Sequence, residues 1–215
     1  MATWRNFAFP GTDIVSSGTM KHDRQIETLT APSSRVAETL ALAFRDDPAL
    51  SWIQPDPEAR RRMLPRFFAI AAEQSQHYGG VLASKSRTAA ALLYPPGQVR
   101  EGGLWVSLRL LAIFKTALSR GLKVAEAMHK EHPRPQPYLY LRYVGVAPEA
   151  QGQGLGGAII RDIIARAAMQ RRGVLLETAT QSNVAIYTRL GFDIVSEWEV
   201  PGGGPKFWTM IHPAP

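Results

Sequence analysis

A glycine-rich turn between an apolar run and an amphipathic segment constrains this chain more than any other feature. The apolar run covers residues 138–146, and the turn carries four glycines: Gly152, Gly154, Gly156 and Gly157. Apolar side chains then recur at helical spacing, at Leu155, Ile159, Ile160, Ile163, Ile164 and Ala167. Glycine lets an anion approach the main chain closely, and the free N–H groups of a first helical turn attract negative charge. The pattern therefore predicts a strand, a phosphate-binding turn and a helix.

Two other interpretations of this turn compete. A glycine cluster before a helix can be a tight turn or a close packing point without any ligand. Gly152, Gly154 and Gly157 also satisfy the dinucleotide-binding fingerprint, with Glu177 near the position of its ribose-binding acid. However, residues 147–151 separate the strand from the first glycine, and too little chain follows Glu177 to complete a doubly wound sheet. The dinucleotide interpretation is therefore disfavoured.

The same residues fit a third pattern, in which Gln151, Gly154 and Gly156 follow the run Val-Ala-Pro at 146–148. Here the chain resembles the GNAT superfamily of acyl-CoA-dependent N-acyltransferases. A second segment, 183–192, is similar to the other signature of that superfamily. The resemblance covers residues 138–192 and extends through the final strands to about residue 212. Within the superfamily, the segments 138–139, 176–178 and 201–210 resemble puromycin N-acetyltransferase-like members.

The resemblance implies that acetyl-CoA is the co-substrate, and the spacing of the histidines predicts a site without a metal. The resemblance places the pyrophosphate of coenzyme A at Gln151, Gly152, Gln153, Gly154, Leu155, Gly156 and Gly157. It also implies that the main chain of Val144, Gly145 and Val146 pairs with the pantetheine arm, and that an N–H near Val144 stabilises the oxyanion. Asn183 is expected to bind the pantetheine, to cap its helix, or both. Tyr187 is expected to protonate the leaving thiolate, although a purely structural tyrosine is the alternative.

The proton acceptor has more than one candidate. The position at which histone-type members carry a catalytic glutamate is occupied here by Tyr140. Glu177, on the adjacent predicted strand, is the nearest carboxylate and therefore the candidate base. It could instead orient the acceptor amine or form an ion pair with Arg142. Ordered water leading to bulk, without a dedicated base, is an equal alternative.

The hydrophobic pattern predicts an α/β fold of the α+β kind: a mixed, mainly antiparallel sheet flanked by helices. Strands are expected at 25–29, 81–84, 88–94, 138–146, 174–178, 191–195 and 206–211. Helices are expected from Ser33 or Ser34 to Arg45, ended by Asp47-Pro48, from 57 to 77 with Pro65 kinking or dividing it, after the glycine turn, and at 181–190. Residues 21–215 form one predicted domain, after a loose extension over residues 1–20.

A long helical pattern lies before the fourth predicted strand, where a minimal member of the superfamily has no such segment. Residues 102–131 form this predicted insertion, as one helix or as a pair broken near Gly121. Charged residues interrupt its apolar run, which argues against a membrane span. Two roles are open for it: packing on the core, or forming a wall of the acceptor pocket.

Composition restricts the remaining classes of function. The chain has no cysteine, which excludes disulfides and thiolate chemistry and agrees with a reducing cytoplasm. Its five histidines lack metal-ligand spacing. The net charge of +7 comes from dispersed basic residues without a nucleic-acid-binding signature, so no nucleic-acid partner is expected. Neither a signal peptide nor a membrane span is recognisable.

The sequence thus predicts a cytoplasmic N-acetyltransferase that acts on a primary amine in a ternary complex. The acceptor is expected to be a small molecule, and a peptide amine is the alternative substrate. A catalytically silent acyl-CoA sensor is the alternative from another class, because Tyr140 stands in place of a glutamate. A homodimer is possible, since dimers are frequent in the superfamily.

Overall fold

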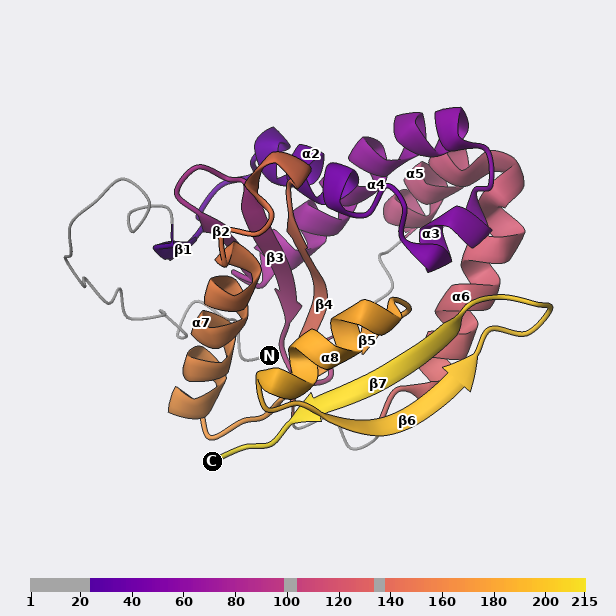
Figure 1. Ribbon diagram of the computed structural model, residues 1–215. Coiled ribbons are helices and arrows are strands. Elements are labelled where there is room, and N and C mark those ends of the chain that lie inside the picture. Colours follow the sequence, from indigo (N-terminus) through magenta and orange to yellow (C-terminus); the bar gives the residue numbers. More distant parts are fainter. Residues whose placement is uncertain (1–23, 99–103, 134–137) are drawn as a thin grey trace.

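The computed structural model describes residues 24–98, 104–133 and 138–215, so the predicted extension over residues 1–20 lies outside the described residues. Within these ranges the strands form one seven-stranded sheet in the order β1-β2-β3-β4-β5-β7-β6 (Figure 1). The strands are β1 (Ile26–Thr28), β2 (Val81–Ser84), β3 (Ala89–Tyr94), β4 (Leu139–Val146), β5 (Val174–Thr178), β6 (Asp193–Glu199) and β7 (Lys206–His212). The sixth strand therefore starts and ends later than the predicted 191–195.

Strand pairing is antiparallel everywhere except between β4 and β5. This arrangement confirms the predicted mixed, mainly antiparallel sheet. The parallel pair is short: Leu139–Leu141 lies opposite Val174–Leu176, and no pairing follows. Beyond that point the two central strands separate while each keeps its other neighbour.

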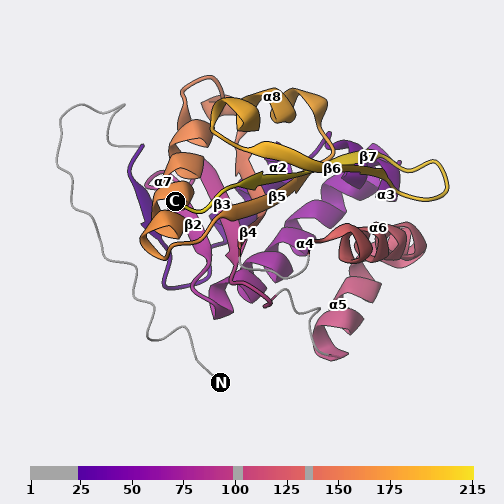
Figure 2. The same cartoon turned by 90° about the horizontal axis from the view of Figure 1, so that it is seen from below.

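Helices cover both faces of the sheet. They are α2 (Ser34–Ala43), α3 (Pro48–Ile53), α4 (Pro57–His77), α5 (Leu104–Phe114), α6 (Leu118–Glu131), α7 (Leu155–Met169) and α8 (Gln181–Arg189), with short 3-10 turns at Lys115–Ala117 and Pro148–Ala150. One apolar core joins α2, α3, α4 and α6 to one face of the sheet, and a second joins α7 and α8 to the other. Figure 2 shows α8 on one side of the sheet and α5 and α6 on the other.

The start of the second predicted helix is confirmed, and the predicted division of this helix at Pro65 is wrong. Asp56 accepts a hydrogen bond from the Glu58 N–H at 3.0 Å, and Pro57 occupies the first helical position, which suits its fixed φ. Pro65 does not divide the helix, because α4 runs without interruption from Pro57 to His77. Burial of neighbours such as Leu64 and Phe68 contributes roughly 2 kcal/mol each, which offsets the hydrogen bond that proline cannot donate.

The segment that was expected to end the first helix instead begins another. Helix α2 ends at Ala43, and Asp47 caps the short helix α3 by accepting the Leu50 N–H at 3.0 Å. The Asp47-Pro48 pair therefore acts as the later Asp-Pro pair does, as a cap followed by a proline at the first helical position.

The insertion is a helix pair whose break lies earlier than predicted. The chain leaves α5 at Lys115, whose φ is +48°, and passes through one 3-10 turn into α6. Gly121 lies inside α6, where an added Cβ would come to 3.5 Å from the Phe114 ring. Because 3.5 Å is an ordinary van der Waals distance, a side chain could be accommodated at Gly121, and this glycine does not break the pair. Among the described residues, no helix is both long and apolar enough to cross a membrane.

Candidate active site

The separation of β4 from β5 leaves main-chain groups of β4 without a strand partner. Ala147 donates its N–H to the Thr88 carbonyl, on the β3 side, at 2.8 Å. Main-chain groups alternate in direction along a strand, so those of Val144 and Val146 face away from β3 and into the gap. The Gln151 side chain, which donates to the Val146 carbonyl at 3.2 Å, confirms that direction. The main chain of Gly145 faces β3 instead.

A bulge precedes these residues. Leu92 pairs with Tyr143 and Leu93 with Leu141, so Arg142 has no partner on β3. An extra residue in one strand interrupts the alternation of side chains and bends the strand. As a result, four successive residues of β4, Leu141 to Val144, all contribute to the same cavity.

The glycine loop presents unpaired main-chain amides at the start of α7. Gly152 and Gly154 have φ of +76° and +80°, a left-handed conformation that favours glycine. Among the described residues, the amides of 152–157 have no hydrogen-bond acceptor, and the first amide in use is that of Ala158, which bonds to the Gly154 carbonyl at 3.0 Å. Free amides at the start of the 15-residue helix α7 give this loop the donors that a diphosphate needs.

Arginine side chains border the loop, and the sequence pattern did not single them out. Arg24 donates to the Gln153 carbonyl at 2.9 Å, and its guanidinium would lie 3.3 Å from a Cβ added to Gly154. Arg161 would lie equally close to a Cβ added to Gly157. Leu155, by contrast, is buried in a small apolar cluster with Ala150, so its side chain anchors the loop.

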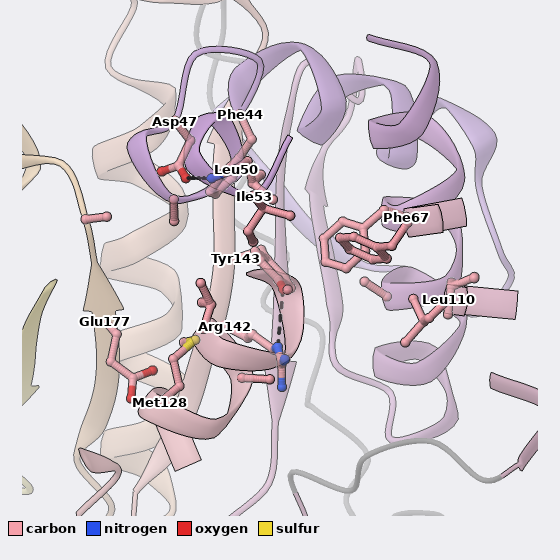
Figure 3. Close-up of a pocket in the computed structure, with 18 of the residues that line it drawn as sticks. Phe44, Asp47, Leu50, Ile53, Phe67, Leu110, Met128, Arg142, Tyr143 and Glu177 are labelled. Atoms are coloured by element: carbon pink, nitrogen blue, oxygen red, sulfur yellow. Dashed lines mark hydrogen bonds between the residues drawn. The ribbon is translucent and has the colours of Figure 1, made fainter. Parts of the chain in front are cut away.

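A cavity of about 530 Å³ opens at the β4–β5 gap (Figure 3). Its floor is β4 and β5, and its walls come from α3, α4, α5, α6 and α8. Most of its lining is apolar, including Phe44, Leu50, Phe67, Leu110, Phe114 and Met128. Both helices of the insertion therefore line the cavity, and they also pack on the core through Phe114 and Val124.

Two of the predicted site residues reach the cavity from α8. Tyr187 is buried, and burial raises the pKa of its hydroxyl above the ordinary value of 10.0. Within the part of the chain that the structure describes, this hydroxyl has no hydrogen-bond partner. Asn183 also lines the cavity, but it does not cap the helix, because the N-cap residue is Thr180.

Glu177 is the centre of a buried polar cluster. Its carboxylate accepts the Tyr140 hydroxyl at 2.5 Å, and its other oxygen lies 3.1 Å from Nδ1 of His132. The side chain is 0% exposed. The alternative in which Glu177 forms an ion pair with Arg142 is wrong, since no such pair occurs in the described residues. His132 was missed because it follows α6, 45 residues away in sequence, without any local pattern.

A second carboxylate lines the cavity, and the sequence reasoning did not consider it. Asp47 uses Oδ1 to cap α3, and burial raises the pKa of its carboxyl above the ordinary value of 3.8. Figure 3 shows Asp47 beside Phe44 and Leu50 at the apolar end of the cavity. A carboxylate in such surroundings binds protons more readily than one in water.

The predicted residues thus fall into two places. Val144, Glu177, Asn183 and Tyr187 meet at the cavity, whereas Gln151–Gly157 lie outside its lining, at the start of α7. Gly145 serves packing, because a Cβ there would come to 2.6 Å from the Cβ of Ala43 in α2. No group of three or more potential metal-ligating side chains occurs in the ranges that the structure describes.

Comparison with known proteins gives one family match. Residues 116–194 match the acetyltransferase (GNAT) domain, a segment that runs from the insertion to the start of β6. The matched residues include the glycine loop, the β4–β5 gap, Glu177 and α8.

Solved structures share the fold over most of the chain. A Corynebacterium glutamicum structure, described as histone acetyltransferase HPA2 and related acetyltransferase, is 26% identical; the match covers 88% of this chain and 96% of that one, with a TM-score of 0.66. A polyamine N-acetyltransferase from Drosophila melanogaster is 16% identical, with coverage of 87% and 98% and a TM-score of 0.54. An agmatine N-acetyltransferase is also 16% identical, with coverage of 87% and 97% and a TM-score of 0.53.

Proposed function

Because this chain belongs to the GNAT superfamily of acyltransferases, we propose that it transfers an acetyl group from acetyl-CoA to the primary amine of a small molecule. The amine attacks the thioester directly while both molecules are bound, and no covalent bond to the protein forms. One observation carries the proposal: unpaired main chain of β4 and a largely apolar cavity meet at the same gap in the sheet.

The residues around the gap fit coenzyme A. The free amides of 152–157 would bind its diphosphate, with Arg24 beside them. The main-chain groups of Val144 and Val146 would pair with the pantetheine arm as an added strand does. Acetyl-CoA supplies the activated carbonyl, and the protein holds it at the mouth of the cavity. The Val144 N–H is the donor toward negative charge on the carbonyl oxygen.

Tyr187 is the proposed proton donor to the leaving thiolate. Tyr187 belongs to the cavity lining, and its hydroxyl has no competing partner among the described residues. Because burial raises its pKa, the hydroxyl stays protonated at physiological pH. A neutral phenol with a free O–H is what this step requires.

Two carboxylates are candidates for the proton acceptor. An amine with a pKa of about 10.4 must lose a proton before it attacks. Glu177, the predicted base, already has both oxygens in contact with Tyr140 and His132. Asp47 has one oxygen in a capping bond, and its raised pKa favours proton uptake. We therefore propose Asp47 as the acceptor, directly or through water, and Glu177 as the residue that holds the cavity wall in place.

A thiol-release assay tests the proposal. The protein is mixed with acetyl-CoA and a library of small primary amines, and free thiol is measured with a colorimetric reagent. Turnover with a subset of small amines is expected. Acetyl-CoA binding without turnover on any small or peptide amine would instead indicate the sensor function, and turnover confined to peptides would indicate a peptide N-acetyltransferase.

A further inference from the structure

The cavity contains a positive charge that nothing in the described part of the chain neutralises. Arg142 lies on the cavity lining at the β4 bulge. Its recorded hydrogen bond is from Nε to the Tyr143 hydroxyl, at a long 3.4 Å (Figure 3). No carboxylate of the described residues forms an ion pair with it. A guanidinium has five N–H donors, so most of its donor capacity remains unused.

Aromatic rings hold this guanidinium in place. Its central carbon lies 5.9 Å from the centre of the Tyr94 ring and 5.7 Å from that of Tyr143. Tyr143 in turn packs edge-on against Phe44, Phe67 and Phe68. Cation–π contacts fix the orientation of an arginine but do not supply the negative charge that a desolvated cation favours.

The negative charges of the cavity are engaged elsewhere. Besides Arg142, the charged residues of the lining are Asp47 and Glu177. Asp47 caps α3, and Glu177 binds Tyr140 and His132. Arg142 is therefore a cation in a largely apolar cavity. A ligand with an anionic group would supply the ion-pair partner that its guanidinium lacks.

The other residues that line the cavity indicate what else such a ligand carries. Helices α5 and α6 contribute apolar side chains, among them Leu110, Phe114, Leu118 and Met128. A wall of this kind favours an aliphatic or aromatic group through the area that it removes from water.

We propose that the acceptor is a primary amine that also carries a carboxylate and an apolar side group, as an apolar amino acid does. The inference rests on the proposed function. The carboxylate binds Arg142, two residues from Val144 on the same strand, and the apolar group lies against α5 and α6. Arginine recognises a carboxylate through two parallel charge-assisted hydrogen bonds. An acceptor of the agmatine or polyamine kind carries a second cation, which Arg142 would repel.

Matched pairs of amines test this inference. The pairs are phenylalanine with phenethylamine and leucine with 3-methylbutylamine, which differ only in the carboxylate. We expect kcat/KM to be about 10- to 100-fold higher for the amino acid of each pair, the range of a charge-assisted contact. Agmatine and spermidine are included as dicationic and tricationic comparisons and should be poorer still.

Two variants assign the preference to Arg142. In Arg142→Gln, the ratio of kcat/KM for phenylalanine over phenethylamine should fall to near one. Arg142→Lys keeps the charge but loses the two-pronged contact, so its ratio should be intermediate. Acetyl-CoA affinity by calorimetry and the thermal unfolding midpoint show whether each variant is folded.

The outcomes separate this inference from the proposed function. Two outcomes overturn the inference but leave acyl transfer standing. In the first, the decarboxylated amines are acetylated as well as the amino acids or better. In the second, Arg142→Gln does not change the ratio of kcat/KM for phenylalanine over phenethylamine. Calorimetric binding of phenylalanine to the CoA-bound protein, abolished in Arg142→Gln but without acetylation, supports the carboxylate site and rejects the enzyme. If the protein neither binds nor acetylates any of the amino acids tested, the inference is overturned.

Discussion

The glycine loop and the amine cavity are the two halves of the proposed site, and they are built by opposite means. The loop is one continuous segment, 151–157, whose functional groups are main-chain amides. The cavity combines side chains from five helices and four strands that are far apart in sequence. A main-chain site tolerates little change in backbone conformation, whereas a side-chain site can change its ligand through single substitutions. This difference predicts where substitutions affect coenzyme A and where they affect the acceptor.

The largest effect is expected in the loop. Gly154→Val places a branched side chain among the free amides and beside Arg24, at a φ of +80°. Acetyl-CoA affinity should fall by about 1000-fold, the equivalent of two charge-assisted hydrogen bonds of roughly 2 kcal/mol each. Calorimetry measures the affinity. The control is Gly203→Val, which has a similar φ of +75° in the β6–β7 turn and should share the backbone strain but retain coenzyme A binding.

A smaller effect, on turnover and not on acetyl-CoA binding, is expected at Tyr187, where the proposed coenzyme A site meets the cavity. Tyr187→Phe should lower kcat by about 100- to 1000-fold, because a general acid contributes in this range, and should change acetyl-CoA affinity by less than about twofold. Burial raises the pKa of Tyr187, so its ionisation should not reduce kcat at any pH below its ordinary value of 10.0. Tyr78→Phe, outside the cavity lining, is the control. Unchanged turnover in Tyr187→Phe would remove this residue from the chemistry.

The choice between the two carboxylates is tested by pH. Burial raises the pKa of Asp47, so loss of kcat on acidification should begin above its ordinary value of 3.8. Asp47→Asn should lower kcat by about 100-fold and remove this acid limb. If Glu177→Gln removes the limb and Asp47→Asn does not, Glu177 is the base.

The raised pKa of Asp47 also predicts the stability of the Asp47→Asn variant. A raised folded-state pKa means that the stability Asp47 contributes is complete below the unfolded pKa and declines as pH rises through the folded value. Asparagine caps a helix about as well as aspartate. Asp47→Asn should therefore be at least as stable as the parent at pH 7 in thermal unfolding, and a marked loss there would contradict the burial account of this carboxyl.

The smallest effect is expected in the wall of the cavity. Ala125 of α6 lines the cavity and is only partly buried, so a larger side chain can enter the cavity without displacing the core. Ala125→Trp should raise the acceptor KM by about tenfold, as lost apolar contact of one to two kcal/mol would, and should leave acetyl-CoA affinity intact. Steady-state kinetics with each substrate varied in turn measures both. An equal rise in both KM values would mean that the two regions are not separate.

The same contrast explains what the sequence could reveal. The strand, turn and helix of segment 144–157 were predicted closely because they are local patterns. The expectation that the main chain of 144–146 faces a ligand came from the family resemblance, and it is wrong for Gly145, whose main chain faces β3. His132 and Asp47 were missed because the fold, not the sequence spacing, brings them to the cavity. The bulge at Arg142 has no sequence signal, and it decides which residues of β4 face the cavity.

A crystal structure of the protein with coenzyme A and an acceptor amine tests the central claim most directly. We predict that the diphosphate lies within hydrogen-bonding distance of the amides of 152–157, and that the sulfur lies in the β4–β5 gap next to Val144 and Tyr187. A diphosphate bound elsewhere, or a pantetheine arm that does not enter the gap, would contradict this account.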